Sequence, residues 1–398
     1  MTERLYYDNA YLTEFDAQVL VCRPNGNHYD VLLNRSAFYP TSGGQPFDTG
    51  MLGDARVIDV NVQGQDVWHT VTKPLSEGAS VHGVIDWARR FDHMQQHAAD
   101  HMIAGALHRI MRGVTIGLHI SEKISSIDVA MPEGVTRISD EDVRRIELDV
   151  NDHIQRNVPI RCWFPPAEEL QTLPLRKAPT VTEHVRIVAI GDDEMVACGG
   201  THPSSAGQLG LVKILSVAPA RGKMRVSFVA GQRALHDYFA CSDAAHAAAE
   251  RLSANLETLP ASIDVLCSRL HTVETELNAL KRDRVLSKAP QMLHDAEVLP
   301  DGTRLIAQFV DADASLLRDL TSMLIEEPGV IAMLGAQSGD QAIYVFGCSD
   351  EVRRDMGTLL RDCARQHGGK GGGRPSFAQG GGSPAILPAA IDAVRAAR

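Results

Sequence analysis

The sequence predicts a mixed α+β protein with several domains. Three observations support this fold class. The first ninety residues alternate short strand-like runs with turn residues, a long later stretch carries apolar residues at heptad spacing, and the last hundred residues alternate strand-like and helical patterns. At 398 residues the chain exceeds one ordinary hydrophobic core, so we expect roughly two to four domains.

Residues 1–90 are predicted to form a small β-barrel domain. Strand-like runs at 31–33 and 55–60 are separated by turn residues such as those at 24–27 and 43–44. Many short strands without a helix between them are typical of a small barrel.

Residues 91–235 are predicted to form an α+β domain. Apolar residues recur at helical spacing over 92–112, and no proline interrupts them. Strand-like stretches follow at 114–120 and 126–130. Ser139 precedes three acidic residues, which is typical of a helix start. Further strand-like pieces complete the domain, at 159–164, 186–190, 209–217 and 223–229.

Residues 236–295 are predicted to form a helical hairpin. Apolar residues in this stretch alternate spacings of three and four, as in a heptad repeat. Pro260 interrupts the pattern. Proline suits the first turn of a helix and breaks a helix interior, so we expect two helices with a joint near 257–260.

Residues 296–398 are predicted to form an α/β domain. Strand-like and helical runs alternate here, at 305–310, 314–325, 330–334, 342–346, 352–364 and 384–397. The segment 368–375 is dense in glycine. Such a segment is either a disordered linker or a loop whose bare backbone amides approach a phosphate or a sugar.

The composition excludes several classes of protein. The formal net charge of −11 argues against a protein coated with nucleic acid, although a local basic patch is compatible with it. We find no apolar run long enough to cross a bilayer and no secretory signal. The seven cysteines are scattered and odd in number, which predicts reduced thiols and a cytoplasmic location.

Two short motifs predict a metal site. His97 and His101 are four residues apart, so on a helix they share one face. Cys198 and His202 repeat that spacing, and the two glycines between them let the backbone fold so that thiolate and imidazole converge. Nitrogen and sulfur donors in this combination are those that tetrahedral zinc prefers. Chance alone would supply about one such histidine pair in a chain with 16 histidines, so the prediction depends on both motifs together.

The segments around these motifs resemble the alanyl-tRNA editing proteins, which are free-standing relatives of the editing domain of alanyl-tRNA synthetase. The resemblance lies in both metal motifs, at 94–101 and 198–202, in the glycine-rich loop at 38–46 and in the strand pair at 118–128. The helical stretch and the segment 368–375 resemble the carboxy-terminal DHH-associated domain of the synthetase. The match covers nearly the whole chain in the expected order.

The sequence departs from the family pattern at two places. Ala98 stands where relatives commonly carry threonine, and Thr41 and Ser42 replace glycine or an acid in the loop. The first change affects polar contacts beside the metal, and the second affects substrate preference. Neither change removes a metal ligand.

The resemblance implies a zinc-dependent hydrolase that removes serine, glycine or both from mischarged tRNA(Ala) at the 3′ ester. A synthetase pocket built for alanine cannot exclude glycine and discriminates only modestly against serine, so a second site is needed. Zinc lowers the pKa of a bound water to about 7. Four protein ligands nevertheless make a closed site. Either one ligand leaves or binds weakly, or the ion orients the substrate.

The candidate site residues fall into four groups. The expected metal ligands are His97, His101, Cys198 and His202. The candidates for catalysis are Gln45, His97, His101 and Cys198, where Gln45 either positions the terminal adenosine or the water, or braces a loop. The candidates for substrate binding are Gly43, Gly44 and His119, and those for tRNA binding are Lys370 and Arg374. Asp100 lies between the two histidines, where it either supports the metal ligands or acts as a base, or faces solvent from the opposite side of the helix, and we expect the last of these.

The expected partner is tRNA(Ala) carrying serine or glycine, and the carboxy-terminal domain is expected to bind tRNA, to form a homodimer, or both. A full alanine ligase needs an ATP-binding core, and only about ninety β-rich residues precede His97. A non-catalytic zinc-containing tRNA-binding module stays open as an alternative. A DHH-type phosphoesterase lacks support because no Asp-His-His cluster is present, and a metalloprotease is disfavoured because the helix lacks the glutamate of His-Glu-x-x-His.

Overall fold

The computed structural model describes residues 1–179 and 184–396 of the chain. The chain forms two compact units, Met1–Ala247 and Ala248–Arg398. Helices and strands occur in both units, so the predicted mixed α+β class is confirmed. The finer division into domains at 1–90, 91–235, 236–295 and 296–398 stays a prediction.

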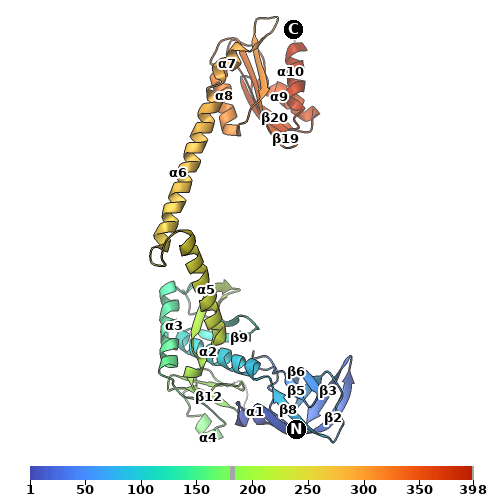
Figure 1. The fold of residues 1–398 in the computed structure, drawn as a ribbon, viewed down its shortest axis with the longest axis vertical. Coiled ribbons are helices and arrows are strands. Elements are labelled where there is room, and N and C mark those ends of the chain that lie inside the picture. The colour runs from blue at the N-terminus through green and yellow to red at the C-terminus, as the bar shows by residue number, and fades with distance from the viewer. Residues whose placement is uncertain (180–183, 397–398) are drawn as a thin grey trace. The chain divides into compact units, whose positions relative to one another are not determined.

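The first unit begins with a closed barrel of six strands (Figure 1). The strand order is β2-β3-β7-β6-β5-β8, and β8 pairs with β2 to close the barrel. Side chains alternate in and out along β2, so Phe15, Ala17 and Val19 enter the core. The bounds are β2 (Glu14–Asn25), β3 (His28–Leu33), β5 (Gly50–Leu52), β6 (Ala55–Gln63), β7 (Asp66–Val71) and β8 (Ser80–Ile85). Three short elements, β1 (Glu3–Arg4), α1 (Leu5–Asp8) and β4 (Arg35–Ser36), flank these strands in the sequence.

Helix α2 (Trp87–Met111) follows the barrel and forms the centre of the first unit. It begins five residues before the predicted start at Asp92, because the side chain of Asp86 caps it by accepting a hydrogen bond from the Arg89 backbone N–H at 3.3 Å. It ends at Met111, and the capping residue that follows, Arg112, has a left-handed φ of 58°. Almost every residue between Arg90 and Leu107 is buried, so this helix is covered on all sides.

Two sheets and a second long helix surround α2. Helix α3 (Asp140–Gln155) begins as predicted, with the Ser139 hydroxyl accepting a hydrogen bond from the Asp142 N–H at 3.1 Å. The antiparallel sheet in the order β14-β15-β10-β9 packs against both helices. Its strands are β9 (Val114–Ile120), β10 (Ser125–Ala130), β14 (Val212–Ala220) and β15 (Lys223–Ala230). A three-stranded sheet holds β11 (Ile160–Trp163), β12 (Ile187–Ile190) and β13 (Glu194–Ala197), and α4 (Ala167–Leu170) and η1 (Ala206–Leu209) lie in the connections.

Two helices carry the predicted heptad stretch. Helix α5 (Gln232–Arg251) and helix α6 (Leu259–Leu286) are separated by residues 252–258, and Pro260 lies in the first turn of α6. The predicted joint is therefore confirmed, because proline without an N–H is tolerated where a helix N–H has no intrahelical partner. The hairpin arrangement of the two helices stays a prediction.

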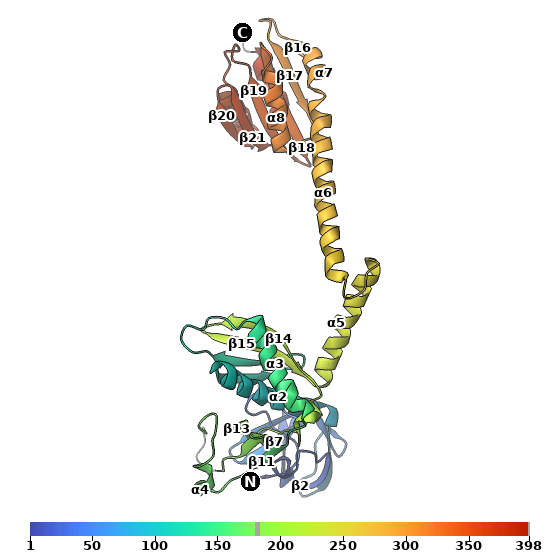
Figure 2. The ribbon, with the colours of Figure 1, turned by 90° about the vertical axis from the view of Figure 1, so that its left-hand side faces the viewer.

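The second unit contains a six-stranded sheet in the order β16-β17-β18-β19-β21-β20, with helices on both faces (Figure 2). The sheet has a hydrophobic core on each face, and alternate residues of β18 belong to one core or the other. Val330, Ala332 and Leu334 pack with α8 and the end of α6, whereas Ile331 and Met333 pack with α9 and α10. The strands are β16 (Glu297–Val298), β17 (Arg304–Phe309), β18 (Val330–Ser338), β19 (Gln341–Cys348), β20 (Lys370–Arg374) and β21 (Phe377–Gly382). The helices are α7 (Ala289–His294), α8 (Ala314–Ile325), α9 (Met356–Gln366) and α10 (Ile386–Ala396).

The glycine-rich segment 368–375 is neither a linker nor a loop, so both predictions of its local structure are wrong. Most of it is the edge strand β20, which pairs with β21. A Cβ atom added at Gly357 of α9 would lie 2.5 Å from the carbonyl oxygen of Gly373. The glycines therefore let a helix and a strand approach closely. The helix predicted over 384–397 is α10, and residue 397 lies outside the described residues.

Among the residues described, no helix combines the length and the apolar character needed to cross a membrane.

Candidate metal centre

Helix α2 supplies the first half of the predicted metal site. His97 and His101 lie one turn apart on the same face, with their ring centroids 5.0 Å apart and their planes nearly parallel at 17°. Both rings are buried, at 2% and 6% exposure. The i, i+4 spacing read from the sequence therefore corresponds to two histidines that face the same point in space.

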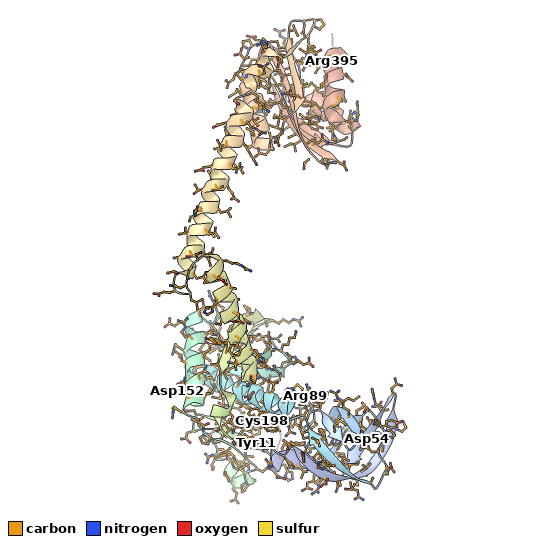
Figure 3. All side chains as sticks on the ribbon, viewed as in Figure 1. Tyr11, Asp54, Arg89, Asp152, Cys198 and Arg395 are labelled. Atoms are coloured by element: carbon orange, nitrogen blue, oxygen red, sulfur yellow. The ribbon has the colours of Figure 1, made fainter. Side chains whose placement is uncertain are left out.

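The turn after β13 supplies the second half. The Cys198 Sγ atom lies 3.3 Å from His97 Nε2 and 3.5 Å from His202 Nε2 (Cys198 is labelled in Figure 3). One ligand atom from each of His97, His101, Cys198 and His202 lies within 4.8 Å of the others. Donors around one tetrahedral zinc ion are about 3.5 Å apart, so the four side chains need only small shifts to share an ion.

The side chain of Arg186 holds the turn that carries Cys198 by hydrogen bonds to the backbone of that turn. The Arg186 guanidinium donates to the Cys198 carbonyl at 3.2 Å and to the Gly200 carbonyl at 2.7 Å. The Gly200 N–H lies 3.3 Å from Cys198 Sγ. An N–H aimed at the sulfur stabilises a thiolate, and Arg186 holds the peptide groups on either side of the one that carries this N–H.

The unpartnered buried nitrogens fit a metal ion. Both ring nitrogens of His101 and the Nδ1 atom of His202 are buried without a hydrogen-bond partner in the described part of the chain. Buried polar atoms are normally paired, so one ring nitrogen of His101 is available to an ion, whereas His202 faces Cys198 with its other nitrogen, Nε2. The donor set suits zinc.

The protonation states agree with this interpretation. Burial lowers the pKa of His97 to about 3, and it places the pKa values of His101 and His202 well below their usual range. The imidazoles are therefore neutral, which is the form that binds metals. Burial also raises the pKa of the Cys198 thiol to about 12. Without a cation the sulfur keeps its proton, so metal binding and thiol deprotonation are coupled.

A cleft of about 610 Å³ opens beside the metal ligands. His97, His101 and Cys198 line it, whereas His202 does not, so the ligand set faces the cleft from one side. The described residues that line the cleft include one carboxylate, Asp100, three basic side chains and three large aromatic rings. These basic side chains are Arg4, Lys177 and Arg186, and these rings are Tyr7, Tyr39 and Phe164.

Asp100 is buried, so the prediction that it faces solvent is wrong. It is 4% exposed, and its Oδ1 atom has no hydrogen-bond partner among the described residues. Burial raises the pKa of Asp100 to about 7. The error arose because helix α2 has no solvent face at this position.

Of the other residues predicted for the site in the first unit, Gly43 lines the cleft, and Gly44, Gln45 and His119 do not. Gly43 and Gly44 form a tight turn with φ values of 58° and 87°, which favour glycine, and Gly43 lines the cleft. Gln45 is fully buried behind His97 and does not line the cleft. His119 is exposed on β9 and lies outside the lining, whereas its neighbour Leu118 is part of it.

Lys370 and Arg374 lie exposed at the two ends of β20 in the second unit. The structure therefore brings the four metal ligands together and leaves these two cations in another unit.

Several residues of the site were missed in the sequence. Arg186 directly precedes the buried strand β12, and Thr201 lies inside the metal turn, but neither position has a spacing that predicts its contacts. Tyr7 and Phe164 contact each other across more than 150 residues, with ring centroids 5.6 Å apart. Contacts that cross so much sequence leave no local pattern.

Comparisons with known proteins identify three matched regions. Residues 5–89 match the model of class II (A) tRNA synthetases. Residues 185–226 match the second additional domain of threonyl and alanyl tRNA synthetases, and residues 302–397 match the DHHA1 domain. The middle match contains Cys198 and His202, half of the metal centre.

The relatives of the chain are named alanine–tRNA ligases. One from Haloquadratum walsbyi is 32% identical over 98% of this chain and 43% of its own length. One from Halobacterium salinarum is 34% identical over 96% of this chain and 42% of its own length. The chain thus spans less than half the length of these relatives. The C-Ala domain of Aquifex aeolicus alanyl-tRNA synthetase aligns with 25% of this chain at 26% identity and a TM-score of 0.23, which is too low to support an argument about the fold.

The order of the three matched regions, the near-complete coverage by alanine–tRNA ligases and the juxtaposition of the two metal motifs agree with one another. The chain is therefore related, over nearly its whole length, to part of the alanine–tRNA ligases, and it carries regions that match the second additional domain of threonyl and alanyl tRNA synthetases and the DHHA1 domain.

Proposed function

We propose that the chain hydrolyses the 3′ ester of tRNA(Ala) that carries serine or glycine, with a zinc ion held by His97, His101, Cys198 and His202. The observation that carries this proposal is the convergence of four metal-binding side chains, three histidines and a half-buried cysteine, beside a cleft. Three of these donors line the cleft, so an ion held by them is within reach of a substrate there.

The chemistry of alanine selection supports the choice of substrate. A pocket that fits alanine also admits glycine, and it rejects serine only weakly, because the added hydroxyl is small. The relatives named alanine–tRNA ligases face this problem, and an editing site that hydrogen-bonds the serine hydroxyl answers it. Alanine would leave the polar groups of such a site unpaired.

The cleft is suited to the 3′ end of a tRNA. Arg4, Lys177 and Arg186 provide positive charge in a chain whose net charge is −11. Phe164 is 45% exposed and lies against Tyr7, so an aromatic surface is available for a terminal base to stack on. Phosphates contact the cations while the ester lies beside the metal ligands.

In this proposal some residues hold the metal ion and others orient the substrate. A bound divalent ion supplies Lewis acidity for ester hydrolysis. The neutral imidazoles and the Cys198 sulfur hold that ion, and Arg186 fixes the turn that carries Cys198. The turn at Gly43 and Gly44 borders the cleft and donates backbone N–H groups to the substrate carbonyl.

The remaining predicted roles belong to the same proposal. His119, which is exposed on β9, contacts the amino acid of the substrate. Lys370 and Arg374 bind the body of the tRNA, and the carboxy-terminal domain pairs two protomers. The reaction takes place in the cytoplasm, where tRNA is charged.

The test is deacylation of Ser-, Gly- and Ala-tRNA(Ala) by zinc-loaded wild-type protein and by Cys198→Ala. We expect the wild type to release serine or glycine and to spare Ala-tRNA(Ala), and we expect Cys198→Ala to act at the uncatalysed rate. Bound zinc is measured in both proteins. A wild type that binds zinc and tRNA but leaves all three esters intact is a tRNA-binding module, and the proposal of catalysis then fails.

A further inference from the structure

The side chain of Gln45 reaches from the first ninety residues into the metal centre. We propose that Gln45 is a positioning residue that holds His97 in the tautomer with the proton on Nδ1, so that Nε2 is free to bind the ion. The proposal depends on the metal site but not on the ester reaction. Gln45 is fully buried and does not line the cleft, so it acts through His97 and not on the substrate.

The orientation of the Gln45 amide is fixed by Thr201. A backbone N–H can only donate, and that of Thr201 lies 3.2 Å from Gln45 Oε1. The other end of the amide, Nε2, donates to the Thr201 hydroxyl at 2.8 Å. The reversed amide would face the Thr201 N–H with a second donor. The atom that faces Thr201 N–H is therefore oxygen.

The same oxygen determines the tautomer of His97. His97 Nδ1 lies 2.8 Å from Gln45 Oε1, and an oxygen acceptor there requires the proton on Nδ1. A neutral imidazole has one proton, so Nε2 carries a lone pair. Nε2 is the atom that lies 3.3 Å from Cys198 Sγ, on the side of the other ligands.

Gly200 provides the space for this pair. A Cβ atom at position 200 would lie 2.2 Å from His97 Cε1, 2.3 Å from His97 Nδ1 and 3.0 Å from Gln45 Oε1. The turn at 198–202 therefore packs directly on the hydrogen bond between His97 and Gln45. The Gln45 amide therefore holds His97 of α2 against the turn that carries Cys198 and His202.

Three variants test the proposal. Gln45→Met keeps the length of the side chain but removes both polar atoms. Gln45→Glu keeps an acceptor for His97 Nδ1 and Thr201 N–H, as in the carboxylate–histidine pairs common at zinc sites. Thr201→Val removes the hydroxyl that Gln45 Nε2 contacts and leaves the contact between Gln45 and His97. It is the matched control, because it tests whether Gln45 acts only by stabilising the turn.

The readouts are the zinc dissociation constant, measured by competition with a chromophoric chelator, and the visible absorption spectrum of the cobalt-loaded protein. We expect Gln45→Met to bind zinc about 10–100-fold more weakly and to shift the cobalt spectrum. Gln45→Glu is expected to keep the wild-type affinity and spectrum, and Thr201→Val to stay close to wild type. Far-UV circular dichroism of the metal-free proteins verifies the fold.

The proposal is overturned if Gln45→Met binds zinc as tightly as wild type, or if Thr201→Val weakens binding as much as Gln45→Met does. If Gln45→Met does not fold, Gln45→Asn replaces it, because its amide is one methylene shorter and cannot reach both partners. A wild-type protein that binds no zinc or cobalt overturns the metal centre itself. Loss of deacylation with unchanged metal affinity concerns only the proposed ester reaction.

Discussion

Arg90 and Asp48 form an ion pair in which neither side chain is exposed to solvent. The Arg90 Nε atom lies 2.9 Å from Asp48 Oδ2, and the guanidinium also donates to the carbonyl oxygens of Ala10 and Ala37. Asp48 in turn accepts a hydrogen bond from the Tyr39 N–H at 2.6 Å. The pair therefore joins helix α2 to the segment that carries the cleft turn, and it orients the barrel relative to the metal ligands.

Removal of one member of this pair should destabilise the first unit strongly. Asp48→Asn leaves the Arg90 charge buried without its partner, which costs about 3–5 kcal/mol. The measurement is the free energy of unfolding in urea. Asp54→Asn is the matched control, because Asp54 pairs with Lys73 at 2.8 Å on the surface, and this change should leave the unfolding midpoint unaltered. Equal midpoints for Asp48→Asn and wild type would contradict the prediction.

This pair also explains why the start of α2 was predicted five residues too late. The helical pattern of apolar residues begins at Asp92 in the sequence, because Arg90 interrupts it with a charge. In the structure that charge is buried against Asp48, which lies 42 residues earlier. A local sequence pattern predicts a helix only where the buried residues of that helix are apolar. It misses a helical turn that buries a charged side chain paired with a residue far away in the sequence.

Local signals did predict the features that local physics controls. The Ser139 cap, the break at Pro260 and the helix over 314–325 are all present, since capping and the missing proline N–H act within a few residues. The convergence of the four metal ligands is present as well. It was predictable because the spacing of four places His97 and His101 on one face of a helix, and the two glycines between Cys198 and His202 let that pair converge in a turn.

The surroundings of the metal ligands could not be predicted in the same way. The contacts of Gln45 with Thr201 and His97 span 156 and 52 residues. The burial of Asp100 depends on elements that cover α2 from several directions. Such features depend on the packing of the whole unit, which has no periodic signature in the sequence.

Gly200 and Gly199 provide a second test of the metal centre. Gly200→Ala places a methyl group within about 2.2 Å of His97, so it should abolish stoichiometric zinc binding. Gly199→Ala is the matched control, because the nearest atom to its added Cβ is the flexible Tyr7 hydroxyl at 3.3 Å. Zinc content per chain, measured by atomic absorption after gel filtration, is expected to fall for the first variant and to be kept by the second. Similar zinc content in both variants would refute the packing argument.

The approach of α9 to β20 makes a third prediction. Gly357→Ala brings a methyl group to 2.5 Å from the Gly373 carbonyl oxygen, where the backbone cannot yield easily. We expect the second unit to lose about 1–3 kcal/mol of stability. Gly381→Ala is the comparison, because its nearest neighbour, the Ala342 carbonyl oxygen, lies at an ordinary distance of 3.4 Å. Urea unfolding followed by circular dichroism separates the two, and equal midpoints would count against the close packing.

His69 in the barrel makes the stability of the protein depend on pH. Its Nδ1 atom lies 3.2 Å from the Val31 carbonyl oxygen, and its Nε2 atom lies 2.7 Å from the Ser36 hydroxyl. The carbonyl can only accept, so Nδ1 carries the proton and Nε2 accepts from the hydroxyl. Burial lowers the pKa of His69 from 6.5 to about 4. The folded barrel therefore holds a neutral ring at pH values where the unfolded chain binds a proton.

The sign of the effect follows from this difference. Between pH 6.5 and pH 4 the unfolded state binds more protons at this site than the folded state, so the stability falls as the pH falls. The full pKa difference corresponds to about 3 kcal/mol, and about 2 kcal/mol of it should be lost at pH 5. His69→Gln has no proton to gain in this range, so its stability should fall by that much less between pH 7 and pH 5. Urea unfolding of both proteins, followed by tryptophan fluorescence, gives the two slopes. If the stability of both proteins changes equally with pH, His69 has the same pKa in the folded and unfolded chains. The prediction that burial of His69 makes the protein sensitive to acid would then be wrong.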